Sequence, residues 1–204
     1  MCFFTYAGGP RIANEVLEGK ETIRERYLPA FFGYSFDDVR RWYAGGALAA
    51  RKEMGQVWRC AYRRDFLERN HIRFDERITL FEDAAFLSEC VAFAEKTASL
   101  SEELYLYRPL TTGNLATGWR KERNWEYKFL IRDFRERLDR RTGGEIWKYC
   151  EASAVFSALE LLKARYRFRE YLAKDRVKAA IRAFPLSVRH PVLAAAVLAM
   201  RAFS

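Results

Sequence analysis

The sequence predicts an α/β protein whose first part mixes strands with helices and whose second part is helical. Two observations carry this prediction. Aromatic-rich or alternating segments typical of strands occur in the first 110 residues, whereas from Arg123 onward the apolar residues recur at helical spacing. The 204 residues are 50% hydrophobic and 16% aromatic, enough for a sizeable core in a chain of about one domain. A disordered class is therefore excluded.

In the first part, strand and helix patterns alternate. The opening MCFFTY has the character of a buried strand, and the following GGP predicts a turn. Further along, the spacing of apolar residues predicts helices over residues 13–27, 36–43, 57–69 and 82–96 and a strand over residues 97–110. Asn70 is expected to stop the third of these helices.

The second part carries only helical patterns. Trp125, Phe129 and then Phe134 or Leu138 mark one helix, and Gly143-Gly144 breaks it. A second long helix is predicted from about residue 146 to residue 162, and a basic one over residues 174–182. We therefore expect two domains, a partial α/β domain over residues 1–117 and a helical extension over residues 118–204.

The net charge of +9 is concentrated in this extension. Residues 1–117 contain 16 Lys and Arg against 17 Asp and Glu, and residues 118–204 contain 20 against 10. Three interpretations stay open: a solvated helix pair packed on the α/β part, a module that docks on an anionic membrane surface, or a nucleic-acid-binding module. The last is disfavoured, because acidic residues are interspersed among the basic ones.

The cysteine and apolar patterns place the chain in the cytoplasm. The four cysteines are far apart, without CxxC spacing or nearby histidines, so they predict reduced thiols and no metal site. Nothing resembles an export signal, and the longest apolar run after the first residues, nine residues from Val192 to Met200, is too short to span a bilayer. Any membrane contact would be peripheral.

The adjacent carboxylates Glu82 and Asp83 stand at the predicted start of a helix. Acidic residues are favoured there because unpaired N–H groups and the helix dipole stabilise negative charge, so capping explains the pair. The same position suits a general base, since a carboxylate at a helix N-terminus stays ionised and can accept a proton. The two interpretations are compatible.

Four short motifs in order resemble the second half of a family 2 glycosyltransferase of the GT-A type, the group that builds bacterial surface polysaccharides. The matching positions are Trp58, Tyr62, Arg63 and Arg64; Phe74, Glu76 and Ile78; Glu82 and Asp83; Tyr107 and Arg108. The resemblance covers about half of the chain, from Cys2 to Arg108. It implies the acceptor-side half of a Rossmann-like GT-A fold, followed here by the helical extension.

The resemblance also implies a reaction and a set of site residues. A sugar would pass from a nucleotide-diphosphate donor to a saccharide or lipid-linked acceptor, with inversion. Asp83 would be the general base, and Glu82 would orient it or bind the acceptor. The implied substrate-binding residues are Trp58, Arg63, Tyr107 and Arg108. Trp58 is alternatively a core anchor, and Arg108 a partner in a surface salt bridge.

The chain departs from the family pattern before these motifs. The nucleotide-binding half and its Asp-x-Asp metal motif have no counterpart, which implies a truncated member whose Met1 is internal to a longer reading frame. No cofactor is then expected in this chain, and Mn²⁺ or Mg²⁺ only with the missing half. The alternative is a non-catalytic binding or scaffold module whose basic tail docks on an anionic membrane surface, such as the inner face of the cell membrane, or on nucleic acid.

Overall fold

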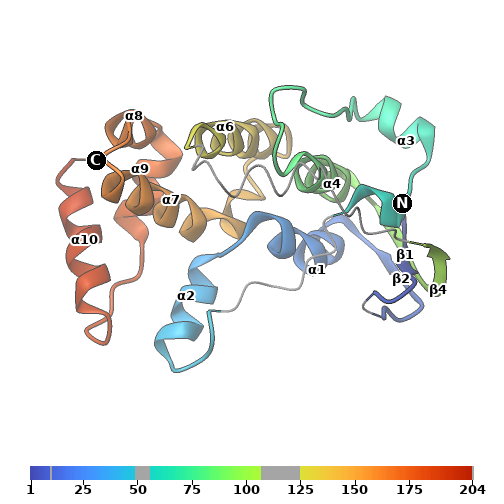
Figure 1. Ribbon diagram of the computed structural model, residues 1–204, viewed down its shortest axis with the longest axis horizontal. Coiled ribbons are helices and arrows are strands. Elements are labelled where there is room, and N and C mark those ends of the chain that lie inside the picture. The colour runs from blue at the N-terminus through green and yellow to red at the C-terminus, as the bar shows by residue number, and fades with distance from the viewer. Residues whose placement is uncertain (10, 49–55, 107–124, 204) are drawn as a thin grey trace. The chain divides into compact units, whose positions relative to one another are not determined.

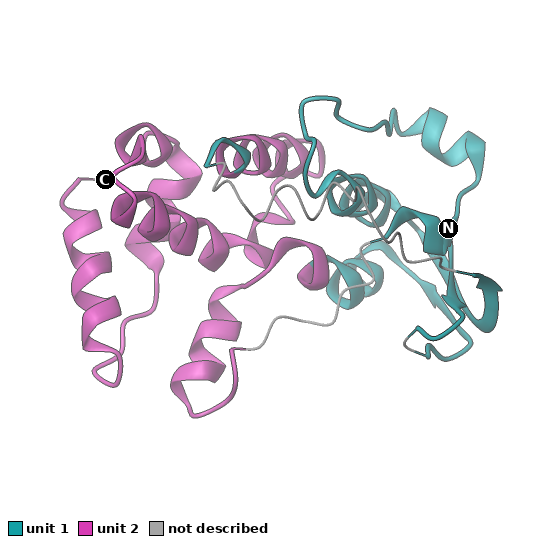
Figure 2. Cartoon of the chain, in the orientation of Figure 1, with its two compact units in different colours: residues 1–28, 54–127 teal, residues 29–53, 128–204 magenta. Residues whose placement is uncertain are grey.

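The computed structural model describes residues 1–9, 11–48, 56–106 and 125–203. The chain forms two compact units, the first from residues 1–28 and 54–127 and the second from residues 29–53 and 128–204 (Figure 2). Within the described ranges, all the strands belong to the first unit and the second is helical. The expected boundary between residues 117 and 118 lies outside the described residues.

The first unit contains a four-stranded mixed sheet in the order β2-β4-β1-β3 (Figure 1). Its strands are β1 (Cys2–Tyr6), β2 (Glu15–Glu18), β3 (Cys60–Ala61) and β4 (Lys96–Tyr105). β1 and β4 are parallel, and the other two pairs are antiparallel. The α/β class and the strands predicted at both ends of this unit are therefore confirmed.

The helical elements of this unit are α1 (Lys20–Phe32), the 3₁₀ turn η1 (Val57–Arg59), α3 (Arg64–Arg69) and α4 (Glu82–Phe93). The ring of Phe3, fully buried in β1, stacks on Tyr27 of α1 at 4.6 Å. Arg24 Nε donates to the carbonyl of Ala92 at 2.9 Å, which satisfies a carbonyl in the last turn of α4. The core of the unit thus ties α1 to the sheet and to α4.

The helix predicted over residues 13–27 is wrong in its first half. Residues 15–18 form β2, which pairs antiparallel with the first residues of β4. Gly19 then adopts φ +91°, a conformation that L side chains rarely adopt, and its N–H donates to Glu95 O at 2.9 Å. The helix begins only after this reversal, at Lys20, and Val16 of β2 is exposed.

The helix predicted over residues 57–69 is also wrong in its first half. Cys60 and Ala61 pair with Phe3 and Cys2 of β1, so the backbone there is extended. α3 begins only at Arg64 and ends before Asn70, whose Nδ2 donates to Phe66 O at 2.8 Å. The predicted stop at Asn70 is confirmed. Trp58 consequently lies on a tight turn and not on a helix.

The second unit is built from helices. They are α2 (Phe36–Tyr43), most of α6 (Glu126–Arg141), η2 (Trp147–Tyr149), α7 (Glu151–Lys163), α8 (Phe168–Leu172), α9 (Asp175–Ala183) and α10 (Pro191–Arg201). Val155, Ala158 and Leu161 of α7 are fully buried and belong to the core of this unit. None of the described helices is long and apolar enough to cross a membrane.

The helices predicted over residues 36–43 and 174–182, and the one that ends at the glycine pair, are confirmed. The single helix predicted from about residue 146 to residue 162 is wrong at its start, where a 3₁₀ turn is separated from the α-helix at Cys150, and the helices over residues 168–172 and 191–201 were not predicted.

Asp139 organises the reversal between α6 and η2. Gly143 and Gly144 take positive φ values there, as the predicted helix break requires. The Oδ1 atom of Asp139 accepts hydrogen bonds from the N–H groups of Ile146 and Trp147 at 3.1 and 2.8 Å. Its Oδ2 atom lies 2.6 Å from Nη2 of Arg176. One buried carboxylate therefore holds three segments of this unit together.

Candidate functional site

Three aromatic side chains meet at the ends of the parallel strands in the first unit. Tyr6 and Tyr105, the last residues of β1 and β4, are register partners. Trp58 of η1 stacks on the Tyr105 ring at 4.6 Å and meets the Tyr6 ring edge-on at 5.0 Å. In open α/β sheets, ligands bind outside the carboxyl ends of the parallel strands, which is where this cluster lies.

Asp83 of α4 is joined to the same turn by a hydrogen bond. Its Oδ2 atom accepts from the N–H of Val57 at 3.3 Å. We call Tyr6, Val57, Trp58, Asp83 and Tyr105 the strand-end site. The structure thus brings two predicted site residues, Trp58 and Asp83, to one turn.

The environment of Asp83 makes it a stronger base than an ordinary aspartate. Burial raises the pKa of its carboxyl group, the Val57 N–H opposes this by lowering the pKa, and the neighbouring Glu82 raises it further. A base whose pKa lies nearer to neutrality drives proton transfer better while it remains ionised. The negative charge of Glu82 thus contributes to the raised pKa of Asp83.

The start of α4 does not use Asp83 as a cap. Phe81 stands at the N-cap with φ 61° and ψ 22°, and its side chain makes no capping hydrogen bond. Glu82 and Asp83 follow in the first turn, where the dipole favours negative charge. The carboxylate of Asp83 accepts a hydrogen bond from the η1 turn. The helix dipole explains why an acidic residue is favoured at this position, but it does not explain the hydrogen bond with Val57. A bulky residue at positive φ costs about 1–3 kcal/mol and occurs preferentially at functional sites.

Arg59 lies against the strand-end site and was missed in the sequence. Its side chain is 1% exposed, and the guanidinium carbon stands 5.1 Å from the centre of the Tyr6 ring. Nε and Nη2 are buried and have no hydrogen-bond partner within the described part of the chain, and burial lowers the pKa of the guanidinium. In the sequence, the placement of Arg59 between Trp58 and Cys60 was the only indication that this arginine could be buried.

The structure places the other predicted residues differently. Arg63 is exposed at the N-cap of α3 and donates two hydrogen bonds to Asp65, at 3.1 and 2.8 Å. It lines a separate hollow of about 440 Å³ beside α3 and the first residues of β4, and no contact within the described ranges joins it to the strand-end site. Tyr107 and Arg108 lie outside the described residues.

Phe74 of the F-x-E-x-I motif packs on α4, and Ile78 of the same motif is buried. Phe74 stacks on Phe86 at 4.3 Å with the rings almost parallel. Phe86 also belongs to the small cluster that it forms with Ile72 and Cys90. This motif therefore positions the helix that carries Asp83.

The described side chains do not fit a metal ion. Within the described ranges, no three His, Cys, Asp or Glu side chains converge as metal ligands would. We derive no chemical step through a metal held by these residues.

Comparison with known proteins gives one partial relative. A segment of 52 residues is 44% identical to "Uncharacterized glycosyltransferase EpsJ" of Bacillus subtilis (strain 168). The match covers 26% of this chain and 15% of that protein, so the matched segment is a small part of both. No family model and no solved structure matches the chain. The similarity supports a glycosyltransferase-like relation.

Proposed function

We propose that the chain belongs to a family 2 glycosyltransferase and carries the acceptor side of a GT-A site. The proposed reaction transfers a sugar from a nucleotide-diphosphate donor to a saccharide or lipid-linked acceptor. The observation that carries the proposal is the hydrogen bond between Asp83 and the Val57 turn, which fixes a carboxylate of raised pKa beside an aromatic cluster at the strand ends. The partial similarity to a glycosyltransferase supports it.

In the proposed step, Asp83 takes the proton of an acceptor hydroxyl group. The hydroxyl oxygen forms a bond to the anomeric carbon of the donor sugar while the bond from that carbon to the phosphate oxygen breaks. The electron pair of the broken bond leaves on the diphosphate, and attack from the opposite face inverts the anomeric configuration. Because Oδ2 is held by the Val57 N–H, Oδ1 is the oxygen that accepts the proton.

The remaining residues have supporting roles in this proposal. The Tyr105 ring, 40% exposed, offers an aromatic face to a sugar ring, and Trp58 holds it in place. Glu82 raises the basicity of Asp83 or contacts the acceptor. Arg63, Tyr107 and Arg108 are kept as proposed substrate contacts. A divalent Mn²⁺ or Mg²⁺ ion is expected with a nucleotide-binding half, where it would neutralise the donor diphosphate.

The proposal is tested by nucleotide release from a panel of nucleotide-diphosphate sugars. The chain, and the product of any in-frame extension upstream of Met1, are incubated with Mn²⁺ and saccharide or lipid-linked acceptors. We expect release that depends on the acceptor and yields a product of inverted configuration. Absence of transfer with both proteins, or retention of configuration, would contradict the proposal.

Tyr105→Ala is expected to weaken saccharide binding. Loss of one stacking ring should lower the affinity about two- to tenfold, the usual worth of an aromatic stacking contact. The measurement is saturation-transfer NMR on a saccharide panel. Leu104→Ala, which removes a neighbouring exposed side chain of β4, is the matched control and should leave the affinity unchanged. Equal losses in the two variants would rule out a specific role for the Tyr105 ring.

A further inference from the structure

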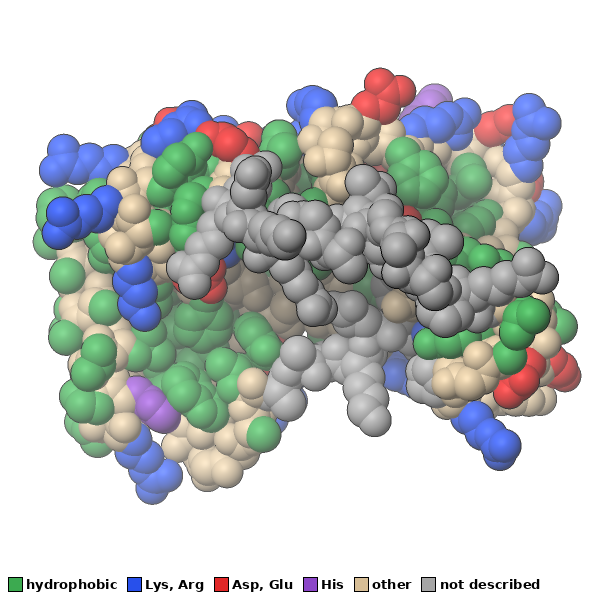
Figure 3. Space-filling model, viewed as in Figure 1, with side chains coloured by type: hydrophobic (Ala, Val, Ile, Leu, Met, Phe, Trp, Pro, Cys, Tyr) green, Lys and Arg blue, Asp and Glu red, His purple; other side chains and the backbone are tan. Residues whose placement is uncertain are grey.

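The last helix of the second unit exposes an apolar face. α10 has eleven residues and no charged side chain before Arg201. Val197 and Met200 are fully buried and attach it to the unit, while Val192 is 84% and Leu198 51% exposed. Val188, just before the helix, is 95% exposed. In Figure 3, hydrophobic side chains cover the part of the surface that α10 occupies in Figure 1, with Lys and Arg around them.

This exposure is unusual for a surface helix. A helix on the surface of a globular protein normally buries one apolar stripe and turns charged residues outward. α10 has apolar residues on both faces. Of the eleven large hydrophobic side chains that are exposed in the described residues, five belong to this region: Leu186, Val188, Val192, Leu198 and Phe203. Clustered exposed apolar groups of this kind mark an interaction surface.

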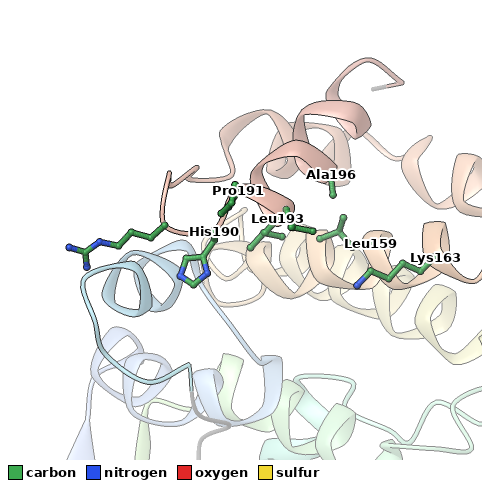
Figure 4. Close-up of a pocket in the computed structure, with 8 residues that line it drawn as sticks. Leu159, Lys163, His190, Pro191, Leu193 and Ala196 are labelled. Atoms are coloured by element: carbon green, nitrogen blue, oxygen red, sulfur yellow. The ribbon is translucent and has the colours of Figure 1, made fainter.

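A hollow of about 390 Å³ lies between this helix and α7 (Figure 4). Leu159 extends into it from α7, and Leu193 and Ala196 from α10. Lys163 and Arg189 stand at its margin and are exposed. Within the described ranges no ion pair joins either of these two cations to a carboxylate, and Arg189 donates one hydrogen bond to the carbonyl of Tyr43 at 3.3 Å. The hollow therefore combines an apolar floor with positive charge that no neighbouring carboxylate neutralises.

The charge around α10 selects the kind of partner. Residues 176–204 contain no Asp or Glu, but five cations: Arg176, which is paired with Asp139, and Lys178, Arg182, Arg189 and Arg201. A second copy of the chain would bring the same cations against one another, which is unfavourable. An anionic surface with an apolar interior satisfies both the cations and the apolar face.

An aromatic stack borders the same surface. The ring of His190, the N-cap residue of α10, lies 4.0 Å from the Trp42 ring and 5.1 Å from the Tyr43 ring. Trp and Tyr are enriched where a protein meets the headgroup region of a bilayer, because their rings are apolar with a polar edge.

We propose that α10, with residues 186–190 before it, docks in the plane of an anionic lipid surface. Eleven helical residues extend about 16 Å, roughly half of a bilayer's hydrocarbon thickness, so the helix lies on the membrane and does not cross it. Val188, Val192 and Leu198 enter the boundary between headgroups and acyl chains. Lys163 and Arg189, both exposed beside the hollow, contact the lipid phosphates.

Sedimentation with vesicles tests this docking. Vesicles of phosphatidylglycerol and phosphatidylcholine in equal parts are compared with vesicles of phosphatidylcholine only. We expect the chain to bind the anionic vesicles and Val192→Ser/Leu198→Ser to lower its partition coefficient at least about tenfold. Val16→Ser, which removes an exposed apolar side chain from β2, is the matched control and should bind like the wild type.

A second pair of variants tests the charge. Lys163→Gln/Arg189→Gln should lower binding to the anionic vesicles about fivefold for each cation removed, whereas Arg64→Gln, an exposed arginine of the first unit, should not. No binding to anionic vesicles would overturn the proposal. Binding that the α10 variants leave unchanged would also overturn it. Two further results would do the same: a dimer in light scattering that Val192→Ser/Leu198→Ser dissociates while no vesicle binding is seen, or a preference for duplex DNA over vesicles.

Discussion

Asp83→Asn is expected to lower the rate of sugar transfer by about 10²–10⁴-fold, the usual contribution of a positioned general base. The amide has almost the shape of the carboxylate, and its oxygen can still accept the hydrogen bond from the Val57 N–H. It cannot accept the proton of the acceptor hydroxyl group. The loss should therefore appear in the rate of transfer and not in the affinity for saccharides.

The same variant should not destabilise the protein at neutral pH. Because burial raises the pKa of Asp83 in the folded state, the folded protein binds the proton more tightly than the unfolded chain. The stability contributed by this group is complete below the ordinary Asp pKa and is lost as the pH rises through the folded-state value. At neutral pH, Asn removes a half-buried charge, so thermal unfolding should occur at the same or a higher temperature.

Asp83→Ala separates the two roles of the side chain. It removes the acceptor of the Val57 N–H together with the base, so we expect both the loss of transfer and a lower unfolding temperature. A transfer rate within about threefold of wild type in Asp83→Asn, well below the usual loss of a general base, would contradict the proposed role of Asp83.

Asp139→Ala is expected to lower the free energy of unfolding by about 2–5 kcal/mol, because two buried N–H groups each lose their acceptor at a cost of about 1–3 kcal/mol. The carboxylate is 1% exposed. Its loss leaves the N–H groups of Ile146 and Trp147 without their acceptor and Arg176 without its charge partner. The measurement is urea unfolding followed by tryptophan fluorescence, with the slope checked for two-state behaviour.

Two further variants calibrate that prediction. Asp139→Asn keeps an oxygen for both N–H groups but loses the ion pair, so its cost should be intermediate. Asp37→Ala removes an exposed ion pair with Arg40 and should cost less than about 1 kcal/mol. If Asp139→Ala costs no more than Asp37→Ala, the carboxylate does not hold the α6–η2 reversal together.

Local sequence patterns predicted much of the second unit because its helices follow their own periodicity. The basic helix predicted over residues 174–182 is α9, with Val177 and Ile181 buried, and the glycine pair ends α6 where predicted. The break at Cys150 and the helices α8 and α10 were not predicted. The failures occur where distant residues decide the backbone. β2 and β3 are strands because they pair with β4 and β1, and nothing within residues 15–18 or 60–61 specifies those partners.

The candidate site divides in the same way. The motif order indicated Asp83 and Trp58, and the structure joins them to one turn. Tyr6 and Tyr105 could not be assigned from the sequence, because only the parallel pairing of β1 with β4 makes them neighbours. Arg59 was hidden for a similar reason, since its burial against Tyr6 follows from the same strand end.

The pH dependence of the transfer rate tests the role of Asp83 most directly. The acid side of the profile reports the pKa of the general base. The account predicts that the wild-type rate falls on acidification with an apparent pKa above that of an ordinary aspartate, and that the residual activity of Asp83→Asn lacks this fall. If the transfer rate of Asp83→Asn falls on acidification with the same apparent pKa as the wild type, another group is the base.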